Sequence, residues 1–174
     1  MNHNYASNLK ATKKVQEMIC SVGVWASKVG TDDDIKKKID YTLTLGSHHT
    51  TWGFRVRNRS SIKDFTIRAY IPATGNSCEY VSWMQGVYPQ FYAYIAADTN
   101  EVKEFWILDV NLIINTPRIL FNTDSWVPNT DGKTGFITWS YSRLYDSGAL
   151  LYRWPPPFNQ ETLTDGNSAG GYSC

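Results

Sequence analysis

Hydrophobic positions divide this chain into an N-terminal helix followed mainly by strands. Apolar residues recur at helical spacing over residues 8–22, with lysines on the other faces, which predicts an amphipathic helix. Farther along, short segments either alternate apolar and polar residues or are apolar throughout, as half-buried and buried strands do. The predicted strands are residues 24–27, 39–45, 52–57, 65–71, 91–97, 104–114, 136–139 and 149–154, and the predicted short helices are residues 78–87, 115–122 and 142–145. This order predicts an α/β or α+β fold with a mixed central sheet and flanking helices.

The segment from residue 39 to residue 59 predicts a β-hairpin, because two strands flank turn-forming residues at 46–49. A four-residue loop places Asp40 across from Arg55, and a loop two residues longer places it across from Arg57. Either register brings a carboxylate close to a guanidinium. The pair is either an ion pair on a solvated face or part of a functional site.

Side chains two apart on a strand share a face, so Arg55, Arg57 and Arg59 lie together on the second strand of the hairpin. Arg68 has the same relation to Thr66 on the next predicted strand. An arginine guanidinium cannot lose its charge at usable pH, and its planar fork suits phosphate or carboxylate. These arginines are therefore candidates for binding an anion.

A run of charges precedes the hairpin. Aspartates at residues 32–34 follow Thr31 and are followed in turn by Lys36, Lys37 and Lys38. Thr and Asp are typical of a helix start, where their side chains accept hydrogen bonds from unpaired backbone N–H groups. The alternative is that these residues supply additional groups around a metal ion or a phosphate.

Asp109 is the single charge within the apolar run of residues 104–114. A buried carboxylate must be paired or protonated. Asp109 is therefore either a structural hydrogen-bond acceptor at a strand end or an auxiliary residue of a site.

Composition indicates one globular domain. The chain has 174 residues, of which 42% are hydrophobic and 14% aromatic, enough for a real core. We predict a domain over residues 1–154 and a flexible tail over residues 155–174, where the composition turns to Pro, Asn, Ser, Thr and Gly. No stretch of 18 apolar residues and no secretory signal is visible, and the three cysteines show no CxxC spacing. We therefore expect a cytoplasmic protein without a membrane partner.

Charge is distributed unevenly. Residues 1–68 hold 12 Lys and Arg against 6 Asp and Glu, whereas residues 69–174 hold 5 against 10, so the parts carry +6 and −5 and sum to the overall +1. A basic part that coincides with the candidate site would attract a polyanion through counterion release. Chance segregation along the sequence is the alternative.

The order of elements from residue 24 to residue 154 resembles the PD-(D/E)xK, restriction-endonuclease-like nucleases, and in particular uncharacterised phage proteins assigned to that fold. The segments that carry the resemblance are TDDDIKKKIDY, GFRVRNR, DFTIR, SCEYVSWMQGVYPQFYAYIAAD, EFWILDV and NTDGKTGF. The resemblance implies a DNA endonuclease that uses Mg²⁺ or Mn²⁺ and acts in the cytoplasm of the host cell. It also implies a homodimer, because many such enzymes cut both strands as dimers.

The sequence departs from this family at its central motif. Asp40 maps onto the family's Asp, but Arg55-Val56-Arg57 stands where the family has acid-x-Lys, and a guanidinium there would repel a metal ion. A second acid would have to come from elsewhere. The candidate catalytic residues are Asp40, Arg55, Arg57 and Glu79; the candidate metal ligands are Asp40, Glu17 and Asp64; and the candidate DNA contacts are Lys36, Lys37, Lys38, Arg59 and Arg68.

Three functions follow as hypotheses. The first is metal-dependent hydrolysis of DNA, with Arg55 and Arg57 stabilising the phosphate. The second is a homologue of the same fold that binds DNA or has a structural role without a metal site. The third is a protein-interaction module that uses an aromatic surface. Aromatic side chains could also stack on the bases of a nucleic acid, with packing in the core as the alternative. The candidates for stacking are Trp52, Tyr80, Trp83 and Tyr88.

Overall fold

The computed structural model describes residues 3–28, 30–32, 34, 38–69, 79–98, 101–115, 126–128 and 135–156. The described part contains two sheets, named here sheet A and sheet B. The strands of sheet A are β1 (Val24–Ser27), β2 (Tyr41–Leu45), β3 (His48–Asn58), β5 (Phe91–Asp98), β6 (Glu101–Asp109) and β9 (Leu150–Trp154), and those of sheet B are β4 (Asp64–Ala69), β7 (Trp126–Pro128) and β8 (Gly135–Ser140). The helices are α1 (His3–Ile19), α3 (Glu79–Met84), α4 (Val110–Asn115) and α6 (Tyr141–Asp146).

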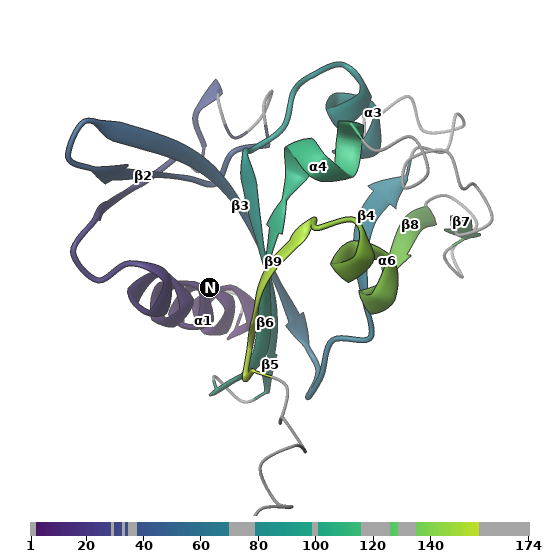
Figure 1. The fold of residues 1–174 in the computed structure, drawn as a ribbon. Coiled ribbons are helices and arrows are strands. Elements are labelled where there is room, and N and C mark those ends of the chain that lie inside the picture. The colour runs from purple at the N-terminus through teal and green to yellow at the C-terminus, as the bar shows by residue number, and fades with distance from the viewer. Residues whose placement is uncertain are drawn as a thin grey trace, which may run out of the picture.

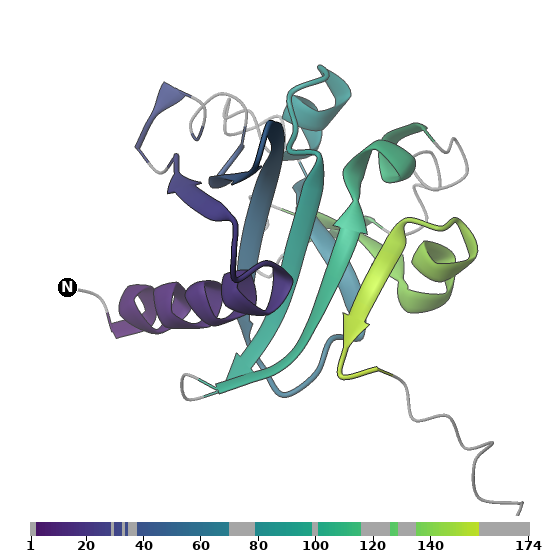
Figure 2. The same ribbon diagram turned by 60° about the vertical axis from the view of Figure 1, so that its left-hand side comes forward.

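Sheet A is mixed, with the strand order β1-β2-β3-β5-β6-β9. Strands β3 and β5 are parallel, and the other neighbouring pairs are antiparallel. Figure 2 shows this sheet with α1 lying across it. The parallel pair requires a long crossover, and β4 and α3 lie within that connection.

Sheet B is antiparallel, with the order β4-β8-β7, and it lies on the opposite side of sheet A from α1 (Figure 1). Helix α6 lies on the same side as sheet B (Figure 1). The described residues therefore form layers, with sheet A between α1 on one side and sheet B on the other.

Alternation along β5 explains why sheet A is the middle layer. Tyr92, Tyr94 and Ala96 belong to the core beside sheet B, whereas Ala93 and Ile95 belong to the core beside α1. All five side chains are less than 5% exposed. A strand that is covered on both faces reads as nearly continuous apolar sequence, as β5 does.

The structure confirms the mixed α/β class, the mixed central sheet and most predicted elements. β1 is found at residues 24–27, as predicted, and β8, α6 and β9 lie within a few residues of their predicted positions. The N-terminal helix starts and ends earlier than predicted. The helix predicted at residues 115–122, apart from its first residue, and most of the tail lie outside the described residues.

One predicted strand was too long. We predicted a strand over residues 104–114, but β6 ends at Asp109 and α4 follows directly. The side chain of Asp109 accepts a hydrogen bond from the backbone N–H of Leu112 at 3.1 Å, which is the bond that a helix N-cap makes. This confirms Asp109 as a structural acceptor at the strand end.

Candidate functional site

A cavity of about 610 Å³ lies between β3 of sheet A and sheet B. Polar and charged side chains from β3 and β4 dominate its lining. The lining residues are Arg55, Val56, Arg57, Asn58, Arg59, Asp64, Thr66, Arg68, Tyr94, Gly135 and Phe136. The structure thus confirms that Arg55 and Arg57 of β3 and Arg59, which directly follows β3, face the same cavity, and it brings Arg68 to that cavity.

The predicted register of the hairpin was wrong. Leu45 pairs with His48 and Tyr41 with Trp52, so the loop is only Gly46-Ser47. Two-residue loops are the commonest hairpin connections, and the φ of +60° at Gly46 suits one. Asp40 consequently lies one step beyond the Tyr41–Trp52 pair, across from Gly53, and not across from Arg55 or Arg57.

Asp40 is bound by the backbone of β3. Its own N–H donates to the carbonyl oxygen of Trp52 at 3.0 Å, and its side chain accepts a hydrogen bond from the N–H of Phe54 at 2.5 Å. Burial raises the pKa of the Asp40 carboxyl to about 6, although the bond from Phe54 lowers it. Asp40 is therefore a carboxyl that changes charge near neutral pH.

Arg55, which lines the cavity, forms an ion pair with Glu79. The guanidinium of Arg55 pairs with the Glu79 carboxylate and also donates to the carbonyl oxygen of Thr66 at 2.9 Å. Glu79 is 8% exposed and accepts two further bonds, from the phenol of Tyr92 at 2.8 Å and from the N–H of Arg68 at 3.2 Å. Both carboxylate oxygens are thereby occupied. Burial raises the pKa of the Tyr92 phenol well above 10, so this phenol stays protonated and donates.

Arg57 and Arg59 converge on one oxygen atom. The phenolic oxygen of Tyr94 lies 3.0 Å from Nε of Arg57 and 3.1 Å from Nη2 of Arg59. Arg57 also donates to the hydroxyl of Thr66 at 2.9 Å. Both guanidinium groups lie over the Tyr94 ring, at 5.7 and 5.5 Å from its centroid, which partly offsets their mutual repulsion.

The cavity carries excess positive charge. Four arginines and one aspartate line it, which gives +3, and Glu79 beside Arg55 reduces the local sum to +2. Asp64 lies 3.7 Å from Arg59. Within the described residues, no carboxylate lies at ion-pair distance from Arg57 or Arg68. An anion would therefore be attracted to this place.

The described residues do not fit the metal site that the nuclease resemblance implies. They contain no group of three or more His, Cys, Asp or Glu side chains that could hold a metal ion. The carboxylate of Glu79 is already bound by Arg55, and Asp64 lies beside Arg59. Glu17 is exposed on α1, across sheet A from the cavity. Mg²⁺ and Mn²⁺ prefer clustered oxygen ligands, and arginines occupy that position here.

The charged segment before the hairpin is only partly described. Thr31 accepts a hydrogen bond from the N–H of Asp34 at 3.4 Å, and the Asp34 carboxylate accepts one from the N–H of Gly30 at 2.9 Å. These bonds support the helix-start interpretation. Lys36 and Lys37 lie outside the described residues, and Lys38 does not line the cavity.

The surface offers no exposed platform at the tryptophans predicted for stacking. Trp52 is 5% exposed and Trp83 is 1% exposed, so both belong to the core.

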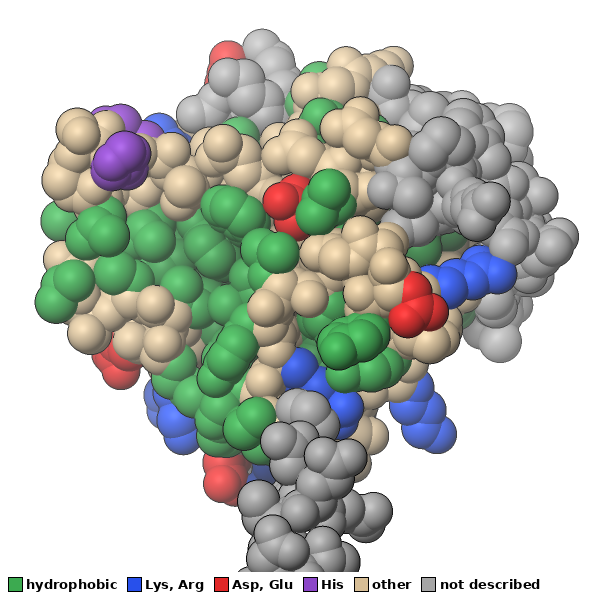
Figure 3. Space-filling view, in the orientation of Figure 1, with side chains coloured by type: hydrophobic (Ala, Val, Ile, Leu, Met, Phe, Trp, Pro, Cys, Tyr) green, Lys and Arg blue, Asp and Glu red, His purple; other side chains and the backbone are tan. Residues whose placement is uncertain are grey.

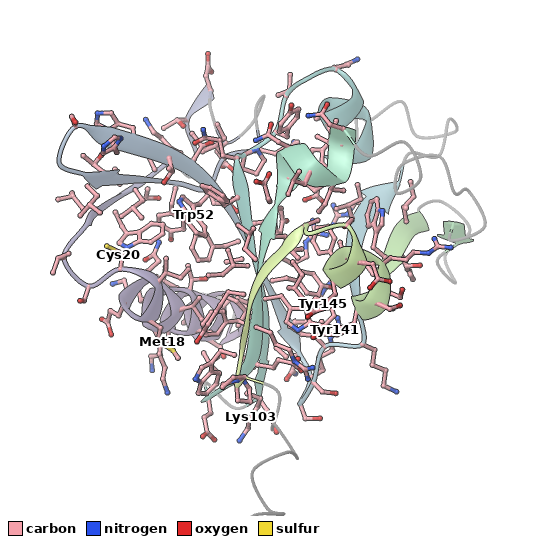
Figure 4. The ribbon with its side chains drawn as sticks, in the orientation of Figure 1. Met18, Cys20, Trp52, Lys103, Tyr141 and Tyr145 are labelled. Carbon is pink, nitrogen blue, oxygen red and sulfur yellow. The ribbon has the colours of Figure 1, made fainter. Side chains whose placement is uncertain are left out.

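Figure 4 shows Trp52, Cys20 and Met18 on the α1 side of sheet A, with Tyr141 and Tyr145 on the other side. Hydrophobic side chains also gather over α1 and the β2–β3 hairpin (Figure 3). The exposed apolar residues on and around these elements include Leu9, Met18, Val22, Val24 and Leu45.

Sequence reasoning missed the residues that shape the site around the arginines. Tyr92 and Tyr94 were predicted only as members of a buried strand, and Thr66 only as sharing a face with Arg68. Their polar atoms nevertheless bind Glu79, Arg57 and Arg59. The sequence does contain one indication of this role. Tyr92 and Tyr94 are two positions apart on β5, so their phenols lie on one face of the sheet, the face that the arginines share.

Comparison with family models, curated proteins and solved structures gives no match for this chain. Among the described helices, none has the length and the apolar composition needed to cross a membrane.

Proposed function

We propose that this protein binds DNA by taking phosphate into the arginine cavity, without a catalytic metal. The observation that carries the proposal is the convergence of Arg57 and Arg59 on the Tyr94 phenol beside Arg68. Hydrogen bonds between a guanidinium and a phosphate are charge-assisted and roughly twice as strong as neutral ones. With DNA as the ligand, we expect a cytoplasmic protein.

The surroundings of the arginines favour phosphate over an incoming carboxylate side chain or a metal complex. Arg57 and Arg59 are already oriented by Tyr94 and Thr66, so little side-chain freedom is lost when an anion binds. Phe136 lines the same cavity and offers an apolar surface to a sugar or a base. The N-terminal 68 residues, which contain all four arginines, carry +6 and add long-range attraction for a polyanion.

The test is DNA affinity measured by fluorescence anisotropy between 50 and 200 mM salt. These concentrations are chosen because phosphate neutralisation makes log K fall linearly with log salt. Arg57→Gln and Arg59→Gln are each expected to weaken binding about tenfold and to reduce the salt slope by about 1. Lys13→Gln is the matched control, because it removes one positive charge from the exposed face of α1 across sheet A.

A cleavage assay with Mg²⁺, Mn²⁺ and EDTA separates binding from hydrolysis. We expect intact plasmid and oligonucleotide in every lane, with binding that does not require metal. Metal-dependent cutting that is lost in Asp40→Ala would instead establish a nuclease. Affinity that is equal in the wild type and in the double variant Arg57→Gln/Arg59→Gln would rule out the cavity as the DNA site.

A further inference from the structure

The arginine cavity gathers its charges at one point, which bears on the kind of phosphate it binds. Nε of Arg57 and Nη2 of Arg59 lie 3.0 and 3.1 Å from the same Tyr94 oxygen, so these two nitrogens are at most about 6 Å apart. Arg68 reaches the same cavity from sheet B. Proteins that follow a strand of nucleic acid instead spread their cations along a groove. Here Arg57 and Arg59 meet at a single position.

We infer that the cavity recognises the terminal phosphate of a nucleic-acid strand, a phosphate monoester, in preference to the diesters within the strand. This inference rests on the proposed function and adds the substrate class. Charge supports it. Counting Glu79 with the lining residues leaves +2, and a monoester carries about −1.5 to −2 at pH 7, whereas each internal diester carries a single negative charge.

Hydrogen-bond donors support the same assignment. A monoester presents three terminal oxygens, all strong acceptors. Nε of Arg59 is buried and has no hydrogen-bond partner among the described residues. Buried donors in folded proteins nearly always have a partner. A phosphate oxygen drawn to Arg57 and Arg59 would supply one once the Arg59 side chain shifts, because this nitrogen is closed to solvent in the present arrangement.

The rest of the cavity fits the end of a strand better than a strand that passes through. Asp64 lines the cavity beside Arg59 and would repel a second phosphate that continues in that direction. The volume of about 610 Å³ exceeds the needs of a phosphate alone and falls in the usual range for small-molecule sites. Phe136 lines this space, where the terminal sugar and base would lie.

The experiment compares one labelled oligonucleotide in four forms: with a 5′-phosphate, with a 3′-phosphate, with hydroxyls at both ends, and as a closed circle. We expect one phosphorylated form to bind at least about tenfold more tightly than the hydroxyl form and the circle, a difference of about 1.4 kcal/mol. A nucleoside monophosphate should compete with it, whereas the nucleoside should not. Arg57→Gln should abolish the preference, and Lys13→Gln should leave it unchanged.

Measuring the preference for the phosphorylated end at several pH values adds a second test. A variant effect caused only by the loss of one positive charge would not change with the ionisation of the phosphate. The second pKa of a phosphate monoester is about 6, so its extra charge is present at pH 7.5 and largely lost at pH 5. The preference for the phosphorylated end should therefore shrink as the pH falls. Circular dichroism checks that each variant is folded.

The possible outcomes distinguish recognition of a terminal phosphate from the more general proposal that the cavity binds DNA. If all four forms bind equally and Arg57→Gln weakens all of them, the terminal-phosphate inference is wrong and phosphate binding stands. If no form binds, the proposed function fails and the inference fails with it. A preference for either phosphorylated end that disappears in Arg57→Gln supports both.

Discussion

The carboxylate of Glu79, the first residue of α3, and the guanidinium of Arg55 on β3 form an ion pair. Glu79 is 8% exposed and Arg55 is 21% exposed, so each charge depends on the other for compensation. We expect Glu79→Gln to lower the free energy of unfolding by about 2–3 kcal/mol, since it leaves a mostly buried cation without its partner. Urea denaturation measures this loss.

The double variant Arg55→Met/Glu79→Gln is the control for this pair. It removes both charges, so we expect it to be less destabilised than the sum of the two single variants. Additive losses in the double variant would mean that the two charges do not stabilise each other.

The buried position of Asp40 makes stability depend on pH. Its folded pKa of about 6 lies above the ordinary value of 3.8, so the folded state holds this proton more tightly than the unfolded state does. The stability that the folded protein gains from this tighter proton binding is fully present below about pH 4 and is lost as the pH rises through 6. Asp40→Asn should therefore match the wild type at pH 4 and be about 1–3 kcal/mol more stable at pH 7.5.

Chemical denaturation at the two pH values tests this prediction for Asp40. Asp98→Asn, which changes an exposed carboxylate at the end of β5, should give the same difference from the wild type at both. An Asp40→Asn variant that is less stable than the wild type at pH 7.5 would show that the charged carboxylate contributes favourably through the bond from Phe54.

Gly53 allows the Tyr92 ring to approach β3 closely. A Cβ atom at Gly53 would lie 2.7 Å from Cε2 of Tyr92, and this ring is buried in the core. We expect Gly53→Ala to cost about 1–3 kcal/mol, because the ring must move and its phenol donates to Glu79. Thermal unfolding measures the loss, with Ser61→Ala in the exposed loop after β3 as the control. An unchanged melting temperature would show that the ring is free to shift.

Anions should stabilise the folded protein if the arginine cavity binds phosphate. Inorganic phosphate at constant ionic strength is expected to raise the melting temperature relative to chloride, because a ligand that binds only the folded state adds RT ln(1 + [L]/Kd) to its stability. At a phosphate concentration of about 100 times Kd, the gain is about 2.7 kcal/mol. Arg57→Gln should remove most of this gain, and Lys13→Gln should retain it. Equal effects of phosphate on all three proteins would indicate a general salt effect.

Local patterns predicted most elements of this fold but not how the strands associate. Alternation predicted the strand that contains Arg68, yet nothing in its sequence showed that β4 leaves the sheet of the hairpin and pairs with β8. Strand partners distant in sequence depend on packing that a local pattern does not record. The division into two sheets was therefore missed.

The site was predicted in part for the same reason. The spacing of Arg55, Arg57 and Arg59 showed their shared face, because a strand has a period of two. The position of Asp40 was wrong because it depended on the loop length, and two residues of loop shift the whole pairing. Glu79 was a candidate because it lies near the hairpin in sequence, but only the fold shows that its partner is Arg55. Within the described residues, Arg57 therefore has no carboxylate partner.

The pairing of β4 with β8 has a consequence for protein synthesis. Asp64 pairs with Ser140 and Arg68 with Phe136, so the wall of the cavity that Gly135 and Phe136 form leaves the ribosome long after the arginines of β3. A nascent chain that has reached residue 110 already carries the clustered cations but not the strand that encloses them. The complete binding site therefore exists only after β8 has been synthesised, has left the ribosome and has paired with β4.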